Sequence, residues 1–117
     1  MKSISKSKLL ACRQCPKRGW LEENRPDLRS DSAGAESRFR IGHQVGSVAR
    51  RLYDPESVGV LIETKANDLA ATFVRSAELL NTRQPIFEAC FQAVGAHVRA
   101  DILLPTSSRG STWRMVE

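Results

Sequence analysis

Three carboxylates stand inside the apolar, β-prone runs that form the last third of this chain. Glu88 lies in the run over residues 85–95, Asp101 in the run over 96–105, and Glu117 ends the run over 111–117. If these acids converge on one sheet, each pair at ~4 Å repels by roughly 4 kcal/mol at an effective dielectric constant near 20. A divalent cation removes that cost, and hard cations such as Mg²⁺ prefer oxygen ligands. The pattern therefore predicts a metal site on the last three strands.

Two other groups of side chains could bind a metal. His43 lies one residue off the apolar stripe of a helical stretch, where a lone histidine more often has a structural role. Cys12 and Cys15 have Cys-x-x-Cys spacing, which supplies half of a tetrahedral zinc site. The alternatives are a redox pair, which Pro16 directly after the motif disfavours, and two small buried residues at a helix end.

Positive charge is concentrated in the first half of the chain. The net charge of the 117 residues is +5, and residues 1–53 hold 12 Lys and Arg against 5 Asp and Glu. Residues 54–117 hold 6 against 8. This division suits a protein whose helices meet phosphates and whose sheet holds a metal. A solvated basic surface explains the charge equally well.

Length and cysteine content indicate a single domain from a reducing compartment. A chain of 117 residues has one domain as its prior. The apolar runs are too short to span a membrane, and residues 1–8 lack the apolar core of a signal peptide. Three cysteines form no disulfide framework. We therefore expect a cytoplasmic protein with no membrane partner.

The first half of the chain predicts three helices. Ser5 or Ser7 caps a short first helix, and Pro16 begins a second one, since proline fits best in the first turn. A longer helix is expected from residue 31 or 32 through Tyr53, with a 3.6-residue apolar period and an arginine-rich opposite face.

The second half predicts a strand over residues 58–63, a helix from residue 67 or 68 to about Leu80, and a three-stranded meander. Gly42 and Gly46 on the apolar face of the long helix indicate close packing there. The residues expected to face the core are Leu69, Phe73, Ala77 and Leu80 of the later helix, together with Trp20 and Trp113. The fold class is α+β, with N-terminal helices packed on a small, mostly antiparallel sheet.

Five motifs occur in an order that resembles the PD-(D/E)XK nuclease superfamily. They are Ser-x-Ser-x-x-x-x-Cys-x-x-Cys-Pro-x-Arg from Ser5, Phe-x-Ile-Gly-His-x-Val-Gly from Phe39, Pro-Ile-Phe-Glu-Ala from Pro85, Val-Arg-Ala-Asp-Ile-Leu from Val98, and Trp-Arg-Met-Val-Glu from Trp113. The chain is similar to the RecB-like branch, which includes CRISPR-associated exonucleases, and to an uncharacterised bacterial domain family related to it. The resemblance covers nearly the whole chain and implies a restriction-endonuclease-like core.

The resemblance assigns roles to four of the candidate residues. Asp101 matches the catalytic Asp, and Glu117 matches the acid of the acid-x-Lys motif. His43 matches a helical metal ligand, and Glu88 matches an upstream acid, although an ion pair with Arg99 explains Glu88 equally well. The cofactor implied is Mg²⁺ or Mn²⁺, and the reaction is phosphodiester hydrolysis of nucleic acid, with DNA favoured over RNA. The side chains expected to hold the sugar-phosphate backbone are Arg38, Arg40, Arg50 and Arg99.

Two departures from the family pattern limit these expectations. The sequence stops two positions before the motif lysine and lacks the helix and strand that normally follow, so we expect a truncated domain that is inactive unless a second polypeptide completes it. Relatives with an iron–sulfur cluster use one N-terminal and three C-terminal cysteines. Only Cys12 or Cys15 could match the first of these, so no cluster is expected.

The sequence therefore predicts one partial nuclease-like domain over residues 1–117. It comprises a basic helical part, 1–53, and a strand-helix-three-strand part, 54–117. A second hypothesis is a non-catalytic remnant that binds nucleic acid or protein through the basic helices. A third is a small zinc protein built on Cys12 and Cys15.

Overall fold

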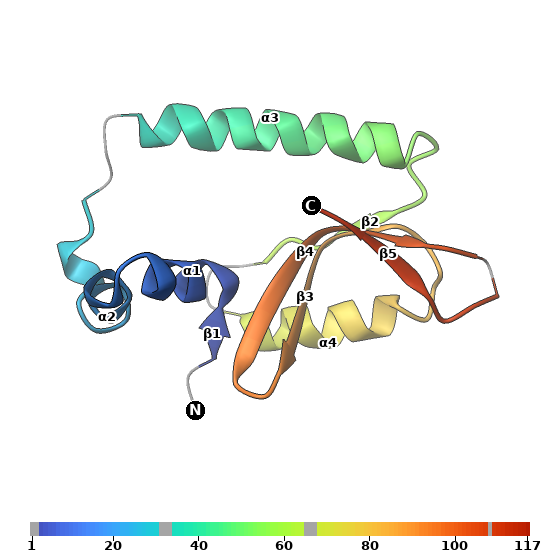
Figure 1. Cartoon of the computed structure of the whole chain (residues 1–117). Coiled ribbons are helices and arrows are strands. Elements are labelled where there is room, and N and C mark those ends of the chain that lie inside the picture. The colour runs from blue at the N-terminus through green and yellow to red at the C-terminus, as the bar shows by residue number, and fades with distance from the viewer. Residues whose placement is uncertain (1–2, 31–33, 65–67, 108) are drawn as a thin grey trace.

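The computed structural model describes residues 3–30, 34–64, 68–107 and 109–117. In this part of the chain it contains a five-stranded mixed sheet with α4 packed along one face (Figure 1). The elements in chain order are β1 (Ile4–Ser5), α1 (Lys6–Gln14), α2 (Pro16–Asn24), the 3-10 helix η1 (Pro26–Leu28), α3 (Ala35–Tyr53), β2 (Val60–Leu61), α4 (Leu69–Leu79), β3 (Ile86–Ala93), β4 (Ala96–Pro105) and β5 (Trp113–Val116). The predicted α+β class and the three-stranded meander are confirmed.

The sheet is organised around β4. Strand β3 pairs antiparallel with it on one side, and β2 continues the sheet by pairing parallel with β3. On the other side β4 has two partners in succession. The short strand β1 pairs parallel with the beginning of β4, and β5 pairs antiparallel with its end. The strand β1 was not predicted, because two residues carry no period.

The local signals for helix starts were read correctly where residues are described. The Ser5 hydroxyl accepts the N–H of Lys8 at 3.3 Å and caps α1, and Pro16 occupies the first turn of α2. Asp68 caps α4 by accepting the N–H of Ala71 at 3.1 Å. The expected start of the long helix at residue 31 or 32 lies outside the described residues.

The core lies between α4 and the sheet, but α4 turns a different face to it than predicted. Thr72, Ser76 and Leu79 are the buried residues of α4, whereas Leu69 and Ala77 are exposed. The two polar residues are tolerated because both hydroxyls have partners. Thr72 donates to the Asp68 carbonyl at 3.1 Å, and Ser76 donates to the Thr72 carbonyl at 2.7 Å and accepts the N–H of Cys90 at 2.9 Å. The buried apolar cluster consists of Ile62, Leu79, Ile86, Ala89, Ala100 and Leu103, with Leu80 and Trp113 packed against it.

The prediction that α3 packs closely on the sheet is wrong. No residue of α3 is buried, and Phe39 and Leu52 are 61% and 73% exposed. A Cβ added at Gly42 would contact nothing within 4 Å, so no other element packs closely against the helix at this glycine. Figure 1 shows α3 apart from the sheet. An apolar stripe fixes which side chains share a face, but not whether another element covers that face. Trp20, also predicted to be buried, is 59% exposed.

A buried carboxylate fixes the turn from α3 into the sheet. Asp54 follows α3 and accepts the N–H groups of Val58 at 3.0 Å and Gly59 at 2.8 Å. A Cβ at Gly59 would lie 2.8 Å from the Asp54 carboxylate, the Phe87 ring and the Pro85 carbonyl. The turn therefore requires glycine at residue 59. No helix in the described ranges has the length and apolar content that crossing a membrane requires.

We predict that Gly59→Ala lowers the free energy of unfolding by about 1–3 kcal/mol, because the new methyl group overlaps backbone and ring atoms. The matched control is Gly42→Ala, which has open space and a helical position, and is expected to stabilise by about 0.5–1 kcal/mol. Urea unfolding measures both. Equal stability of the two variants would contradict the tight turn.

Candidate functional site

The strand register places the three predicted carboxylates in one row across the sheet. On β3 and β4, Phe87 pairs with Ile102 and Ala89 pairs with Ala100, so Glu88 stands opposite Asp101. On β4 and β5, Ile102 pairs with Val116, and the same register continued by one residue brings Glu117 opposite Asp101 from the other side. Glu88, Asp101 and Glu117 are hereafter the acidic row.

The acidic row borders a notch in the edge of the sheet. Strand β1 pairs with β4 at Ala96 and His97, and β5 pairs with it from Ile102 onward. Among the described residues, no strand covers residues 98–101 of β4 on that side. Asp101 therefore lies at an open edge, where a ligand can reach it without displacing a strand.

Two of the three acids have a cationic partner, and the side chain of the third has none among the described residues. The Lys6 ammonium at the start of α1 donates to Glu117 at 2.5 Å. Arg99 lies 3.7 Å from Glu88, which is the ion pair that the sequence suggested as an alternative role. Asp101 is exposed and makes no hydrogen bond or ion pair with any described residue. Two exposed ion pairs thus balance part of the negative charge of the acidic row.

Backbone conformation is unusual at the acidic row. Glu88 has a φ of 62°, a left-handed value inside a strand. In the buried cluster, Ile86 and Ala89 of β3 are three residues apart, and so are Ala100 and Leu103 of β4. In a regular strand, residues on one face are two apart. A left-handed conformation costs on the order of 1–3 kcal/mol for a residue other than glycine. Glu88 is half-buried at this position, whereas its neighbours Phe87 and Ala89 are buried.

The other predicted metal ligands do not join the acidic row. His43 is exposed on α3, which lies apart from the sheet (Figure 1). Cys12 and Cys15 are exposed free thiols. Within the described ranges no three His, Cys, Asp or Glu side chains gather as metal ligands. The zinc hypothesis therefore has no preformed site in this part of the chain.

The acidic row nevertheless fits a cation that takes few protein ligands. Mg²⁺ is usually bound through one or two carboxylates, with water and substrate phosphates completing its shell. Asp101 is accessible, and the exposed pairs of Glu88 and Glu117 are of the kind that contributes little stability and is easily exchanged. Asp101 and Glu117, with Glu88 beside them, can hold such an ion once Lys6 moves aside.

The predicted phosphate-binding arginines are spread over two regions. Arg99 belongs to the acidic row through Glu88. Arg38 lines a cavity beside the N-terminal helices, whereas Arg40 and Arg50 lie elsewhere on α3. The residue that sequence reasoning missed is Lys6. Its partner Glu117 is 111 residues away, so no local pattern could reveal the pair.

A scan against protein-family models finds no match, and searches of curated proteins and of solved structures find none either. The resemblance found in the sequence therefore stays a hypothesis, and function has to be argued from the acidic row and its surroundings.

If the Lys6–Glu117 pair is exchangeable, removing it costs little. Lys6→Ala is expected to lower the free energy of unfolding by less than about 0.5 kcal/mol. The neighbouring change Ser5→Ala removes the cap of α1 and is expected to cost about 1 kcal/mol. Thermal and urea unfolding of both variants check this order. A larger loss for Lys6→Ala would show that the pair is structural.

Proposed function

We propose that this chain carries the metal-dependent phosphodiesterase site of a PD-(D/E)XK-type nuclease domain acting on nucleic acid, with DNA favoured over RNA. The observation that supports this most directly is the acidic row, in which three neighbouring strands present carboxylates beside an open sheet edge. We place the activity in the cytoplasm, where exposed thiols such as Cys12 and Cys15 stay reduced.

Asp101 and Glu117 would hold Mg²⁺ or Mn²⁺, with Glu88 as a further oxygen donor. A bound cation would supply Lewis-acid stabilisation of the phosphoryl group and a bound water of lowered pKa. Arg99, the ion-pair partner of Glu88, offers a guanidinium to the phosphate. Lys6 balances the charge of Glu117 until the substrate and the cation arrive. His43, on the separate helix α3, is not needed for this site.

The rival function is a non-catalytic protein that binds nucleic acid through its basic helices. It is favoured by the concentration of Lys and Arg in residues 1–53. The two functions differ in one property: binding in the rival depends on salt but not on a divalent cation.

Metal binding is the first test of the proposal. Calorimetric titration with MgCl₂ or MnCl₂ is expected to show binding that weakens about tenfold or more in Asp101→Asn, since even residues that only support a ligand carry that much affinity. Glu56→Gln, which removes an exposed carboxylate in the turn after α3, is the matched control and should bind as wild type does. Equal affinity of all three proteins would remove the acidic row as a metal site.

Hydrolysis is the second test. A 5′-labelled DNA strand incubated with Mn²⁺, the protein and a peptide that supplies the motif lysine is expected to be cleaved. Both Asp101→Asn and Glu117→Gln should abolish this cleavage, and EDTA should stop it. Cleavage that persists in Asp101→Asn would point to a contaminant. DNA binding without cleavage, insensitive to metal and sensitive to salt, would favour the rival function.

A further inference from the structure

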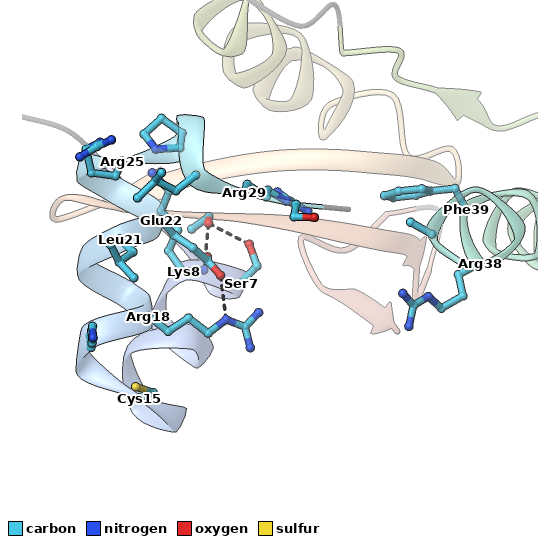
Figure 2. Close-up of a pocket in the computed structure, with 16 residues that line it drawn as sticks. Ser7, Lys8, Cys15, Arg18, Leu21, Glu22, Arg25, Arg29, Arg38 and Phe39 are labelled. Carbon is cyan, nitrogen blue, oxygen red and sulfur yellow. Dashed lines mark hydrogen bonds and ion pairs between the residues drawn. The ribbon is translucent and has the colours of Figure 1, made fainter. Parts of the chain in front are cut away.

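A basic cavity opens between the N-terminal helices and the start of α3. Its volume is about 1020 Å³, and its walls come from α1, α2, η1, the segment after η1 and the first turns of α3 (Figure 2). The side chains that give it its charge are Lys8, Lys17, Arg18, Arg25, Arg29 and Arg38. It is hereafter the N-terminal basic cavity. Ligand pockets in proteins span roughly 300–1,000 Å³, so this one can take several linked chemical groups.

Cationic side chains outnumber carboxylates around the N-terminal basic cavity, although three of them are ion-paired: Lys8 with Glu23, Arg18 with Glu22 and Arg25 with Asp27. Six cationic side chains line it, and Glu22 is the single carboxylate among its described lining residues. Figure 2 shows Arg18 and Arg38 extending into the space between α2 and α3 from opposite sides. A concave surface lined by one sign of charge concentrates ligands of the opposite sign. The ligand is therefore an anion with several charges.

Several of these cations are held in place by local partners. Arg18 donates to Glu22 at 2.8 Å and to Gln14 at 2.8 Å. Arg25 donates to Asp27 at 2.8 Å, and this hydrogen bond holds the pKa of the Asp27 carboxyl below its ordinary value. These pairs are exposed, so they orient the guanidinium groups without binding them tightly. Phosphate oxygens can share the remaining N–H donors.

The cavity also has apolar walls, which a purely ionic ligand would not need. Leu21, Leu28 and Phe39 line it together with the cations. Leu28 and the aromatic ring of Phe39 are both largely exposed. Proteins that bind single strands combine a basic groove along the backbone with aromatic faces on which bases stack. A duplex keeps its bases stacked inside, so an aromatic wall favours an unpaired strand.

The N-terminal basic cavity is connected to the acidic row through one turn of chain. Ser5 and Ser7 line the cavity, and Lys6 between them donates to Glu117. A polymer bound in the cavity can therefore continue past the start of α1 to the open edge of β4. A single nucleotide would occupy only one of the two regions, the cavity or the open edge of β4.

We propose that the N-terminal basic cavity binds the backbone of single-stranded DNA and leads the strand to the acidic row. The inference rests on the proposed function, because it names where the nucleic acid of that site is held and in which form. Lys17 and Arg18 contact phosphates, and Phe39 stacks on a base. Binding itself needs no divalent cation, since no carboxylate of the acidic row lines the cavity.

Fluorescence anisotropy with a labelled 12-nucleotide DNA strand in EDTA tests this inference separately from the metal site. Lys17→Ala/Arg18→Ala is expected to weaken binding about tenfold and to reduce the slope of log affinity against log salt by about 1.4, because each phosphate contact on a single strand contributes about 0.7. The matched control, Arg75→Ala/Arg109→Ala, removes two exposed arginines elsewhere and should lower affinity only slightly.

The aromatic wall gives a second, independent variant. Phe39→Leu keeps an apolar side chain but loses the ring, and is expected to weaken binding of the strand about fivefold or more. Phe39→Trp should restore binding. Because Phe39 is exposed, neither change should alter the unfolding midpoint, which urea unfolding verifies.

Three results would overturn the inference. One is an equal loss of affinity in the Arg75/Arg109 control, which would show an effect of net charge alone. The second is tighter binding of the duplex of the same sequence. The third is binding of vesicles containing phosphatidylserine, or of polyglutamate, in preference to the DNA strand. If the strand binds as predicted but Mn²⁺ does not, the metal-site proposal fails, whereas the proposal that the N-terminal basic cavity binds single-stranded DNA still stands.

Discussion

The register of β3, β4 and β5 is the constraint on which the candidate site depends. Backbone pairing brings Glu88, Asp101 and Glu117 to one level of the sheet, and no rearrangement of side chains alone removes that proximity of their positions. Two cations balance part of the negative charge of the acidic row. Arg99 comes from the same sheet, and Lys6 comes from α1. Both pairs are exposed, and Asp101 has no described partner. The charge of the acidic row is thus balanced only partly by the described residues.

The topology of β4 makes this acidic row accessible. A single partner strand along the whole edge would have covered Asp101, but β1 and β5 share the edge and leave residues 98–101 between them. The turn from β1 into α1 then brings Lys6 to the acidic row and Ser5 and Ser7 to the N-terminal basic cavity. One short segment therefore connects the N-terminal basic cavity with the acidic row.

Local chemistry could be predicted from the sequence, and long-range packing could not. Ser5, Pro16 and Asp68 mark helix starts because their effect acts within one turn of chain. The meander followed from its turn residues and apolar runs. The buried face of α4 was missed because Thr72 and Ser76 look solvent-exposed by type. Their burial is explained by hydrogen bonds of the Thr72 hydroxyl to the Asp68 carbonyl and of the Ser76 hydroxyl to the Thr72 carbonyl and the Cys90 N–H.

The candidate site divides in the same way. Its carboxylates stood out because charged residues inside apolar strands need a reason, and the register does align them. The pairing of Arg99 with Glu88 could also be suggested from the sequence, whereas Lys6 lies 111 residues from Glu117, beyond any local pattern. Whether α3 was covered, and hence where His43 lies, depended on packing that periodicity does not encode.

The most direct test of the central claim is a Mn²⁺ titration followed by backbone amide NMR. Paramagnetic broadening should affect the amides that flank the acidic row on all three strands, namely those of Phe87, Ala89, Ala100, Ile102 and Val116, before it affects the other amides of the protein. That result would show that three strands converge on one cation. Broadening confined to a single strand, or spread over the exposed acids of the whole surface, would contradict the account.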